Sequence, residues 1–266
     1  MQDHFGPARA LIERAPFRVG AFARSAPGDV LLEHDADAEF PSASVIKVPL
    51  VMALYADAAE GRIDLGQRVE AGERVDGSGV LRDMRDIGPL SLRDLAALAI
   101  ELSDNTATNR LIERVGTERV AQRLTEWGCA TTALRRRMYD FAAAERGLEN
   151  VASARELGSL LSRLVAGECV DRATSDAVLA VMERCDDDRK LRRFLGPNVK
   201  VPSKSGTLDA SRNDVAVFRG PERTVLVAAF TSEVKDHLAA EHLLGIIGRC
   251  AATAAGMSVP PLPFGD

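Results

Sequence analysis

The sequence predicts an α+β fold, in which one antiparallel sheet is assembled from both ends of the chain and an all-helical domain is inserted between them. Short β-rich segments bounded by Gly and Pro turns occur near the N-terminus and again after Pro197. Between them, apolar residues recur at helical spacing. Because a sheet must bury its apolar face against another layer, we expect N- and C-terminal helices to flank it.

The N-terminal part of the chain predicts one helix and two strands. Residues 8–15, "ARALIERA", have the apolar spacing of a short amphipathic helix. The segments 17–25, "FRVGAFARS", and 28–35, "GDVLLEHD", follow as strands separated by the turn residues of "APG". These elements place residues 1–40 in the sheet domain.

The middle of the chain predicts a succession of helices. An apolar run begins at Val45 and continues as a helix to about Gly61. Ser91 is a good N-cap for the next helix, whose leucines recur at helical spacing as far as Leu102. Further helical patterns cover residues 106–115, 117–126, 153–165 and 172–184. We therefore expect a helical domain over residues 41–197.

The C-terminal part predicts an antiparallel meander closed by a long helix. The three strand segments and the helix cover residues 199–207, 212–220, 223–233 and 235–255. Residues 198–266 thus complete the sheet domain begun by residues 1–40. A cleft between the two domains is the expected place for an active site.

The composition argues against several classes of function. A net charge of −5 on 266 residues, with one dense basic cluster at residues 135–137, does not suit a nucleic-acid-binding protein, which needs a basic face. No apolar stretch approaches the roughly 20 residues of a membrane-spanning helix. The first residues lack the basic and apolar regions of a secretory leader. We expect a cytoplasmic location for the chain as it stands, or a periplasmic or secreted one if a signal peptide was removed.

The cysteines and histidines do not predict a metal centre. The 4 cysteines are widely spaced and form no Cys-x-x-Cys pair, so we interpret them as reduced thiols. His237 and His242 lie on a predicted helix, but their separation is not that of metal ligands. We expect no metal, no cofactor, a small-molecule substrate and a monomeric chain.

The first candidate catalytic motif is Ser44-x-x-Lys47 in "PSASVIKVPL". At the start of a helix, residues three apart share one face, so the amine can reach the hydroxyl. A serine becomes a strong nucleophile only when a base takes its proton, and a lysine can do so if burial or a nearby cation lowers its pKa. The same spacing also fits an N-cap serine and a solvated lysine. It recurs at Ser232 and Lys235, so the spacing alone does not decide.

The second motif is "SDN", residues 103–105, between two predicted helices. Ser103 and Asn105 could point into the cleft from this connection. Ser, Asp and Asn are also good helix caps, which is the alternative interpretation.

The third motif is Lys204-Ser205-Gly206-Thr207 on the first of the late strands, with Arg212 beyond it. A small residue followed by Gly lets the strand backbone approach a ligand closely. An edge strand can also pair with a substrate amide, and an arginine can bind a carboxylate through two hydrogen bonds. The alternative is a plain strand with a Gly bulge.

Together, in this order, the three motifs are those of the penicillin-recognising serine enzymes. With "GVLRDM" and "LSLRDLAALAIELSDNTATNRLIERVG", they make the chain resemble class A β-lactamases and their penicillin-binding-protein relatives over nearly its whole length. The resemblance implies a β-lactamase/transpeptidase-like fold. It also implies a hydrolase of β-lactam-type cyclic amides that works through an acyl-enzyme on Ser44.

The resemblance further implies a role for each matched residue. Ser44 would be the nucleophile and Lys47 its proton acceptor or relay. Ser103 would pass a proton to the leaving nitrogen, and Lys204 would supply positive charge beside it. The backbone N–H groups of Ser44 and Thr207 would form the oxyanion hole. The implied substrate-binding residues are Asn105, Ser205, Thr207 and Arg212.

The residue that activates the deacylating water stays open at this stage. Class A enzymes carry a Glu-x-x-Leu-Asn stretch in an omega-shaped loop for this purpose. Here "ERGLEN" offers Glu145, but with one residue too many before Asn150, and Asp140 is the second candidate. With a well-placed carboxylate, the expected function is β-lactam hydrolysis. Without one, we expect a slow-deacylating D-alanyl-D-alanine peptidase-like protein, or an esterase or acyltransferase acting on acyl peptides or esters.

Overall fold

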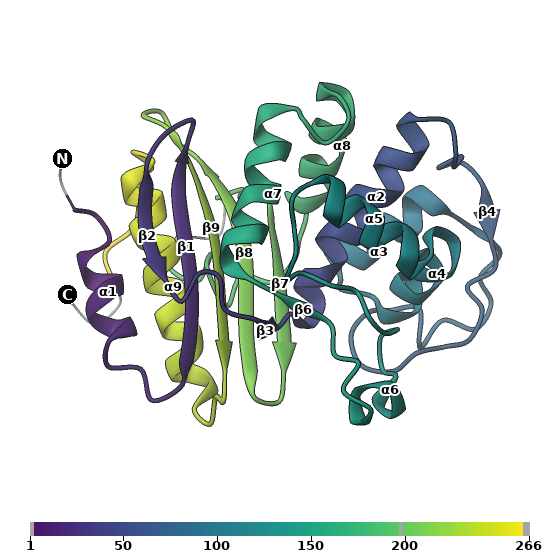
Figure 1. Ribbon diagram of the computed structural model, residues 1–266, viewed down its shortest axis with the longest axis horizontal. Coiled ribbons are helices and arrows are strands. Elements are labelled where there is room, and N and C mark those ends of the chain that lie inside the picture. Colours follow the sequence, from purple (N-terminus) through teal and green to yellow (C-terminus); the bar gives the residue numbers. More distant parts are fainter. Residues whose placement is uncertain (1–2, 197–198, 263–266) are drawn as a thin grey trace.

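One five-stranded antiparallel sheet, built from both ends of the chain, is the centre of the fold (Figure 1). The computed structural model describes residues 3–196 and 199–262. The strand order is β2-β1-β9-β8-β7, so β1 from the N-terminal end pairs directly with β9 from the C-terminal end. The predicted α+β class is therefore confirmed. The strands are β1 (Arg18–Ala26), β2 (Val30–His34), β7 (Ser203–Leu208), β8 (Ser211–Arg219) and β9 (Thr224–Ser232).

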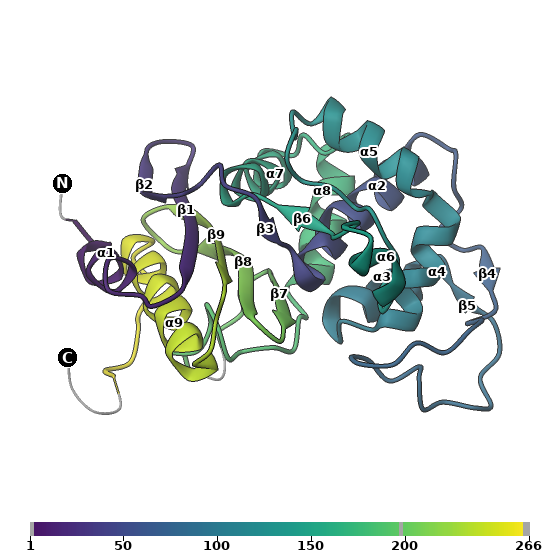
Figure 2. The ribbon, with the colours of Figure 1, turned by 60° about the horizontal axis from the view of Figure 1, so that its bottom comes forward.

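The two faces of the sheet bury different layers, because successive side chains on a strand point to opposite sides. On β8, Val215 and Val217 belong to the apolar core shared with the helical part of the chain. Ala216 and Phe218 belong instead to the core under α9 (His237–Ala254). Helix α1 (Gly6–Ile12) packs beside α9 on this outer face (Figure 2). The flanking terminal helices were predicted, and the structure confirms them.

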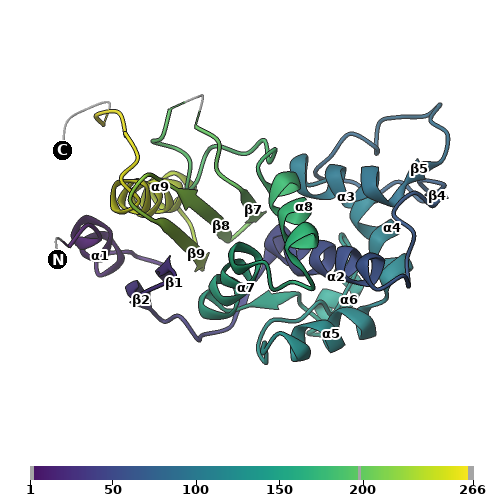
Figure 3. The same ribbon diagram turned by 90° about the horizontal axis from the view of Figure 1, so that it is seen from above.

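The other side of the molecule is helical and is organised around one buried helix, α2 (Lys47–Ala59). Every residue of α2 from Lys47 to Asp57 is buried, and it contacts α3, α4, α5 and α8 (Figure 3). A helix that is buried all round needs no polar face, which is why its sequence is an almost unbroken apolar run. The surrounding helices are α3 (Leu92–Glu101), α4 (Asn105–Val115), α5 (Thr117–Glu126), α6 (Phe141–Glu145), α7 (Ala154–Ala166) and α8 (Arg172–Met182).

Helix α7 joins the helical part to the sheet. It packs on β1 and β9, and Gly158 lies so close to Phe22 that an added Cβ would come within 2.5 Å of the ring. The division into residues 1–40 plus 198–266 and residues 41–197 remains our proposal. Its second boundary lies outside the described residues.

Short irregular elements complete the helical part, and no periodic pattern in the sequence predicts them. The two-residue strand β3 (Phe40–Pro41) pairs with β6 (Val151–Ala152), and β4 (Arg68–Val69) pairs with β5 (Leu90–Ser91). The β3–β6 pair ties the segment before Ser44 to the long loop after α5. All four cysteines are free and buried. In the part of the chain that the structure describes, no helix is long and apolar enough to cross a membrane.

Candidate active site

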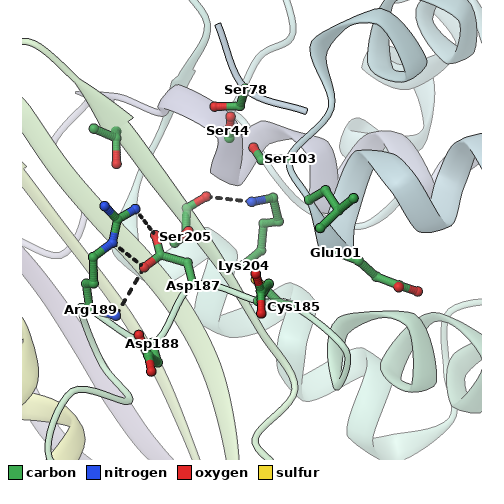
Figure 4. A pocket seen from close by; sticks show the side chains of 13 residues that line it. Ser44, Ser78, Glu101, Ser103, Cys185, Asp187, Asp188, Arg189, Lys204 and Ser205 are labelled. Atoms are coloured by element: carbon green, nitrogen blue, oxygen red, sulfur yellow. Dashed lines mark hydrogen bonds and ion pairs between the residues drawn. The ribbon is translucent and has the colours of Figure 1, made fainter. Parts of the chain in front are cut away.

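Three segments that are distant in the sequence meet where the sheet edge faces the helices (Figure 4). The 3₁₀-helix η1 (Ala43–Ile46) leads into α2 and lies against β7, the edge strand of the sheet. The connection between α3 and α4 forms the opposite wall. The resulting cavity has a volume of about 430 Å³. Its lining includes Ser44, Ser78, Ser103, Lys204, Ser205 and Thr207.

Ser44 lies on η1, and its surroundings explain the glycine of the third motif. A Cβ on Gly206 would lie 2.9 Å from the Cβ of Ala43 and 3.2 Å from the backbone nitrogen of Ser44. Only a residue without a side chain allows β7 to approach η1 this closely. Thr207 follows directly and lines the cavity with Ser44. Ala43 has a φ of 48°, which lies in the left-handed region that is unfavourable for a residue with a Cβ. Such strained backbone conformations are concentrated at functional sites.

Lys47 is fully buried, and its amine contacts the second motif. Its Nζ donates hydrogen bonds to Ser103 O at 2.7 Å, Ser103 Oγ at 3.2 Å and Asn105 Oδ1 at 2.9 Å. Burial and the nearby charge of Lys204 hold the pKa of Lys47 well below its ordinary value. A neutral lysine amine can accept a proton, so this side chain has the property that a base needs. No hydrogen bond between Lys47 and Ser44 is present among the described residues.

Residues 103–105 form hydrogen bonds both to Lys47 and to the loop that contains Asp76, Val80 and Leu81. Asp104 caps α4 through Oδ1, which accepts from the N–H of Ala107, and its Oδ2 accepts from the N–H groups of Val80 and Leu81. The Nδ2 of Asn105 donates to the carbonyl of Asp76 in the same loop. This loop carries Ser78, which lies in the cavity beside Ser44 (Figure 4). Ser78 belongs to none of the three motifs, and the only feature of the sequence that marks it is the pair of glycines that flank it.

Lys204 is fully buried at the base of the cavity, among other buried charges. Its Nζ donates to the carbonyl of Ser205 at 2.8 Å. Burial lowers the pKa of Lys204, while nearby Asp214 and Asp187 act in the opposite direction. Burial also raises the pKa of Asp214 to about 7. A second buried lysine, Lys190, donates to Asp187 at 2.6 Å.

Comparison with known proteins places the chain in a family. The model of the β-lactamase enzyme family matches residues 8–254. The chain belongs to this family. The curated β-lactamase AST-1 of Nocardia asteroides is 30% identical over 221 residues, which is 81% of this chain and 71% of that protein.

Solved structures show the same fold. The β-lactamase of Sphaerobacter thermophilus DSM 20745 has a TM-score of 0.86 at 30% identity, covering 96% of this chain and 99% of that one. An ancestral class A β-lactamase has a TM-score of 0.84 at 24% identity, covering 94% of this chain and 99% of that one. The β-lactamase-like fold expected from the motifs is therefore confirmed.

Arg212 does not line the cavity of this β-lactamase family member. Its guanidinium donates to the carbonyls of Leu208 and Ser211, and it lies 3.4 Å from Glu241 of α9. The arginine that does line the cavity is Arg189, which is paired with Asp187 (Figure 4). A motif fixes where a residue sits on a strand but not where a long side chain turns.

Neither sequence candidate for the deacylating base lines the cavities beside Ser44. Asp140 caps α6, where it accepts from the N–H of Ala143, and Glu145 lies at the exposed end of the same helix. Other carboxylates line these cavities: Glu101, Asp186, Asp187 and Asp188 line the cavity described above, and Glu149 lines a second cavity of about 210 Å³ that also contacts Ser44. The only sequence signal of Glu149 is its position directly before Asn150.

The same second cavity has an aromatic rim. Tyr139 and Phe141 are 44% and 59% exposed and pack edge to face with their ring centroids 4.9 Å apart. Both line the cavity with Ser44 and Asn105. Among the described residues, no group of three His, Cys, Asp or Glu side chains could hold a metal ion.

Proposed function

We propose that this chain is a serine β-lactam hydrolase that forms an acyl-enzyme on Ser44 and acts as a monomer. The observation that carries the proposal is the position of Lys47, a fully buried amine with a lowered pKa in the cleft that holds Ser44. A serine needs such a base to become a nucleophile. Family membership makes a β-lactam the natural substrate class.

In the acylation step that we propose, Ser44 Oγ attacks the lactam carbonyl carbon and its proton passes to Lys47. The developing negative charge on the carbonyl oxygen is bound by the N–H groups of Ser44 and Thr207. As the ring C–N bond breaks, Ser103 gives its proton to the nitrogen. Ser103 then regains a proton from Lys47, to which it is hydrogen-bonded at 3.2 Å.

For substrate binding, we propose that Lys204, Ser205 and Thr207 hold the substrate carboxylate along β7. The charge of Lys204 and two hydroxyl groups suit a carboxylate. Asn105 would bind the amide of the acyl side chain. Its Oδ1 accepts from Lys47 and its Nδ2 donates to the carbonyl of Asp76, so one lone pair and one N–H remain for the substrate. Arg212 faces away from this pocket, so we do not include it in the proposed anion site.

A slow-deacylating peptidase- or esterase-like protein is the second candidate. The observation that favours it is the ion pair between Glu149 and Arg136. This ion pair engages the carboxylate of the smaller cavity that contacts Ser44. Slow release of the acyl group would follow if no other group activated water.

The proposal is tested by mixing the protein with benzylpenicillin and following its intact mass, alongside hydrolysis of a chromogenic cephalosporin. Rapid turnover supports a β-lactamase, and a lasting adduct with little turnover supports the second candidate. The S44A variant should lose both labelling and turnover. The S232A variant changes the serine of the other Ser-x-x-Lys match, on β9, and should keep both. Labelling of S44A would overturn the assignment of the nucleophile.

A further inference from the structure

A third cavity lies between the end of β1 and the C-terminal half of α7. Its volume is about 540 Å³, which exceeds the 430 Å³ of the cavity that contains Lys204 and is large enough for a small organic molecule. Among the residues that the structure describes, none of those lining it also lines a cavity that contacts Ser44. It is therefore separate from the candidate active site.

The cavity arises because a tight contact between β1 and α7 is followed by a loose one. Phe22 and Arg24 are two residues apart on β1, so both face the same side of the sheet. Gly158 and Ser162 are four residues apart on α7, so they share one face of the helix. Phe22 packs directly on Gly158, where an added Cβ would come within 2.5 Å of the ring. One helical turn further on, Arg24 and Ser162 line the cavity instead of packing together.

Two polar atoms of this lining are buried and have no hydrogen-bond partner among the described residues. They are Nε of Arg24, on the strand, and Oγ of Ser162, on the helix. The Nη2 of Arg24 donates to the carbonyl of Gly28 at 3.1 Å, which leaves four of the five guanidinium N–H groups for other acceptors. Buried polar groups in folded proteins are nearly always paired. Two unpaired ones on facing sides of one cavity indicate that it takes a polar ligand.

The strand is irregular at the same point. Ala23 pairs with Leu32, but Arg24 pairs with Val30, so β2 carries one extra residue, Leu31. Such a bulge bends the strand pair and re-aims side chains, and bulges are frequent beside functional sites. The irregularity coincides with the unpaired guanidinium and not with the tightly packed part of β1.

The lining combines positive charge with an aromatic surface. Arg24 and Arg163 contribute two positive charges and Glu168 one negative charge. In the described part of the chain neither arginine forms an ion pair, and Arg163 donates to the backbone carbonyl of Glu168 at 3.2 Å. Trp127, the single tryptophan of the chain, also lines the cavity. Guanidinium groups bind carboxylates and an indole packs against planar rings, so the lining suits an aromatic carboxylate.

We propose that this cavity is a binding site for a small aromatic carboxylate. The carboxylate accepts from Nε of Arg24 and from Oγ of Ser162, and the ring packs against Trp127. Binding thus gives both buried polar atoms the partner that the described residues do not supply. The site does not depend on an acyl-enzyme at Ser44.

The test is titration of the protein with benzoate. The fluorescence of Trp127 reports on this cavity, because the chain has no other tryptophan, and isothermal titration calorimetry measures the same affinity independently. Benzamide keeps the ring without the charge, and acetate keeps the charge without the ring. Each should bind about tenfold or more weakly than benzoate.

Variants locate the site. R24Q removes the positive charge and should weaken benzoate binding about 10–100-fold, while R24K should restore part of the affinity. S162A should weaken it about 2–10-fold. R219Q removes the same charge from the exposed end of β8, outside the cavity, and should bind benzoate as wild type does. Thermal unfolding of each variant checks that the fold is kept.

Three results would overturn the proposal. One is the absence of benzoate binding by calorimetry. Another is equal affinity for benzoate and benzamide, because the arginine would then recognise nothing. The third is wild-type affinity in both R24Q and S162A. Benzoate that competes with hydrolysis of the chromogenic cephalosporin and keeps its affinity in R24Q lies in the cleft beside Ser44, and this outcome also counts against the site.

Discussion

The two walls of the cleft are built in different ways. The wall proposed for acylation consists of buried polar groups on regular elements: Lys47 begins α2, Asn105 begins α4 and Lys204 lies on β7. The wall that carries Glu149 is a long loop, and the ion pair between Glu149 and Arg136 is partly exposed. Buried groups on helices and strands can be fixed by short local motifs, whereas a loop needs specific long-range partners.

This difference predicts that changes in the two walls separate the two chemical steps. Changes in the buried wall should affect labelling by a β-lactam. Changes in the loop should affect release of the acyl group.

The largest effect is expected from K47M, which removes the amine and keeps an unbranched side chain in the buried site. Acylation should fall by about 10²–10⁴-fold, as expected for the loss of a general base. In the wild type, acylation should rise with pH as Lys47 loses its proton. Because burial and Lys204 lower the pKa of Lys47, this rise should lie well below pH 10.5. The measurement is the rate of adduct formation across pH, and a wild-type rate in K47M would contradict the role of Lys47.

The motifs in the sequence located the residues of the buried wall, whereas the carboxylate that lines the cavity from the loop, Glu149, was not predicted. Ser44, Lys47, Ser103, Asn105 and Lys204 carry motif spacing, and the structure brings all five to one cleft. Spacing predicts their proximity because each motif sits at the start of a helix or on a strand, where local geometry fixes direction.

The misses share one physical cause. Glu149 depends on Arg136, 13 residues earlier in an irregular loop, and Arg212 turns toward Glu241 on a helix that follows much later in the chain. Side-chain direction set by distant partners leaves no periodic or local signal. Asp140 and Glu145 had the expected chemistry, but the short helix α6 directs them elsewhere.

An intermediate effect is expected from G206A, which acts where the two steps share one element. The added Cβ would press on Ala43 and on the carbonyl of Ser42 at 3.0 Å, and this would move β7 away from η1. The N–H groups of Ser44 and Thr207 would then bind a developing oxyanion less well, at a cost of about 10²-fold for a displacement near 1 Å. Both acylation and deacylation pass through such an oxyanion, so both rates should fall together.

The matched control is G88A, because nothing lies within 4 Å of a Cβ at Gly88. It should leave both rates at the wild-type level. A loss confined to one step in G206A would show that the oxyanion site is not shared.

The smallest effect on the chemical steps is expected from D214N, which concerns stability instead: a pKa raised from 3.8 to about 7 corresponds to at most about 4 kcal/mol. Burial raises the pKa of Asp214 from 3.8 to about 7, so the folded chain holds a proton there that the unfolded chain releases at lower pH. The stabilising contribution of the protonated form is complete below about pH 4 and is lost as pH rises to about 7. Asn cannot ionise, so D214N should flatten this part of the pH dependence of unfolding. The measurement is denaturant unfolding at several pH values, with D176N on the exposed face of α8 as the control. An unchanged slope in D214N would mean that the carboxyl of Asp214 is ionised in the folded chain throughout, and that the buried wall balances its lysines with a full negative charge.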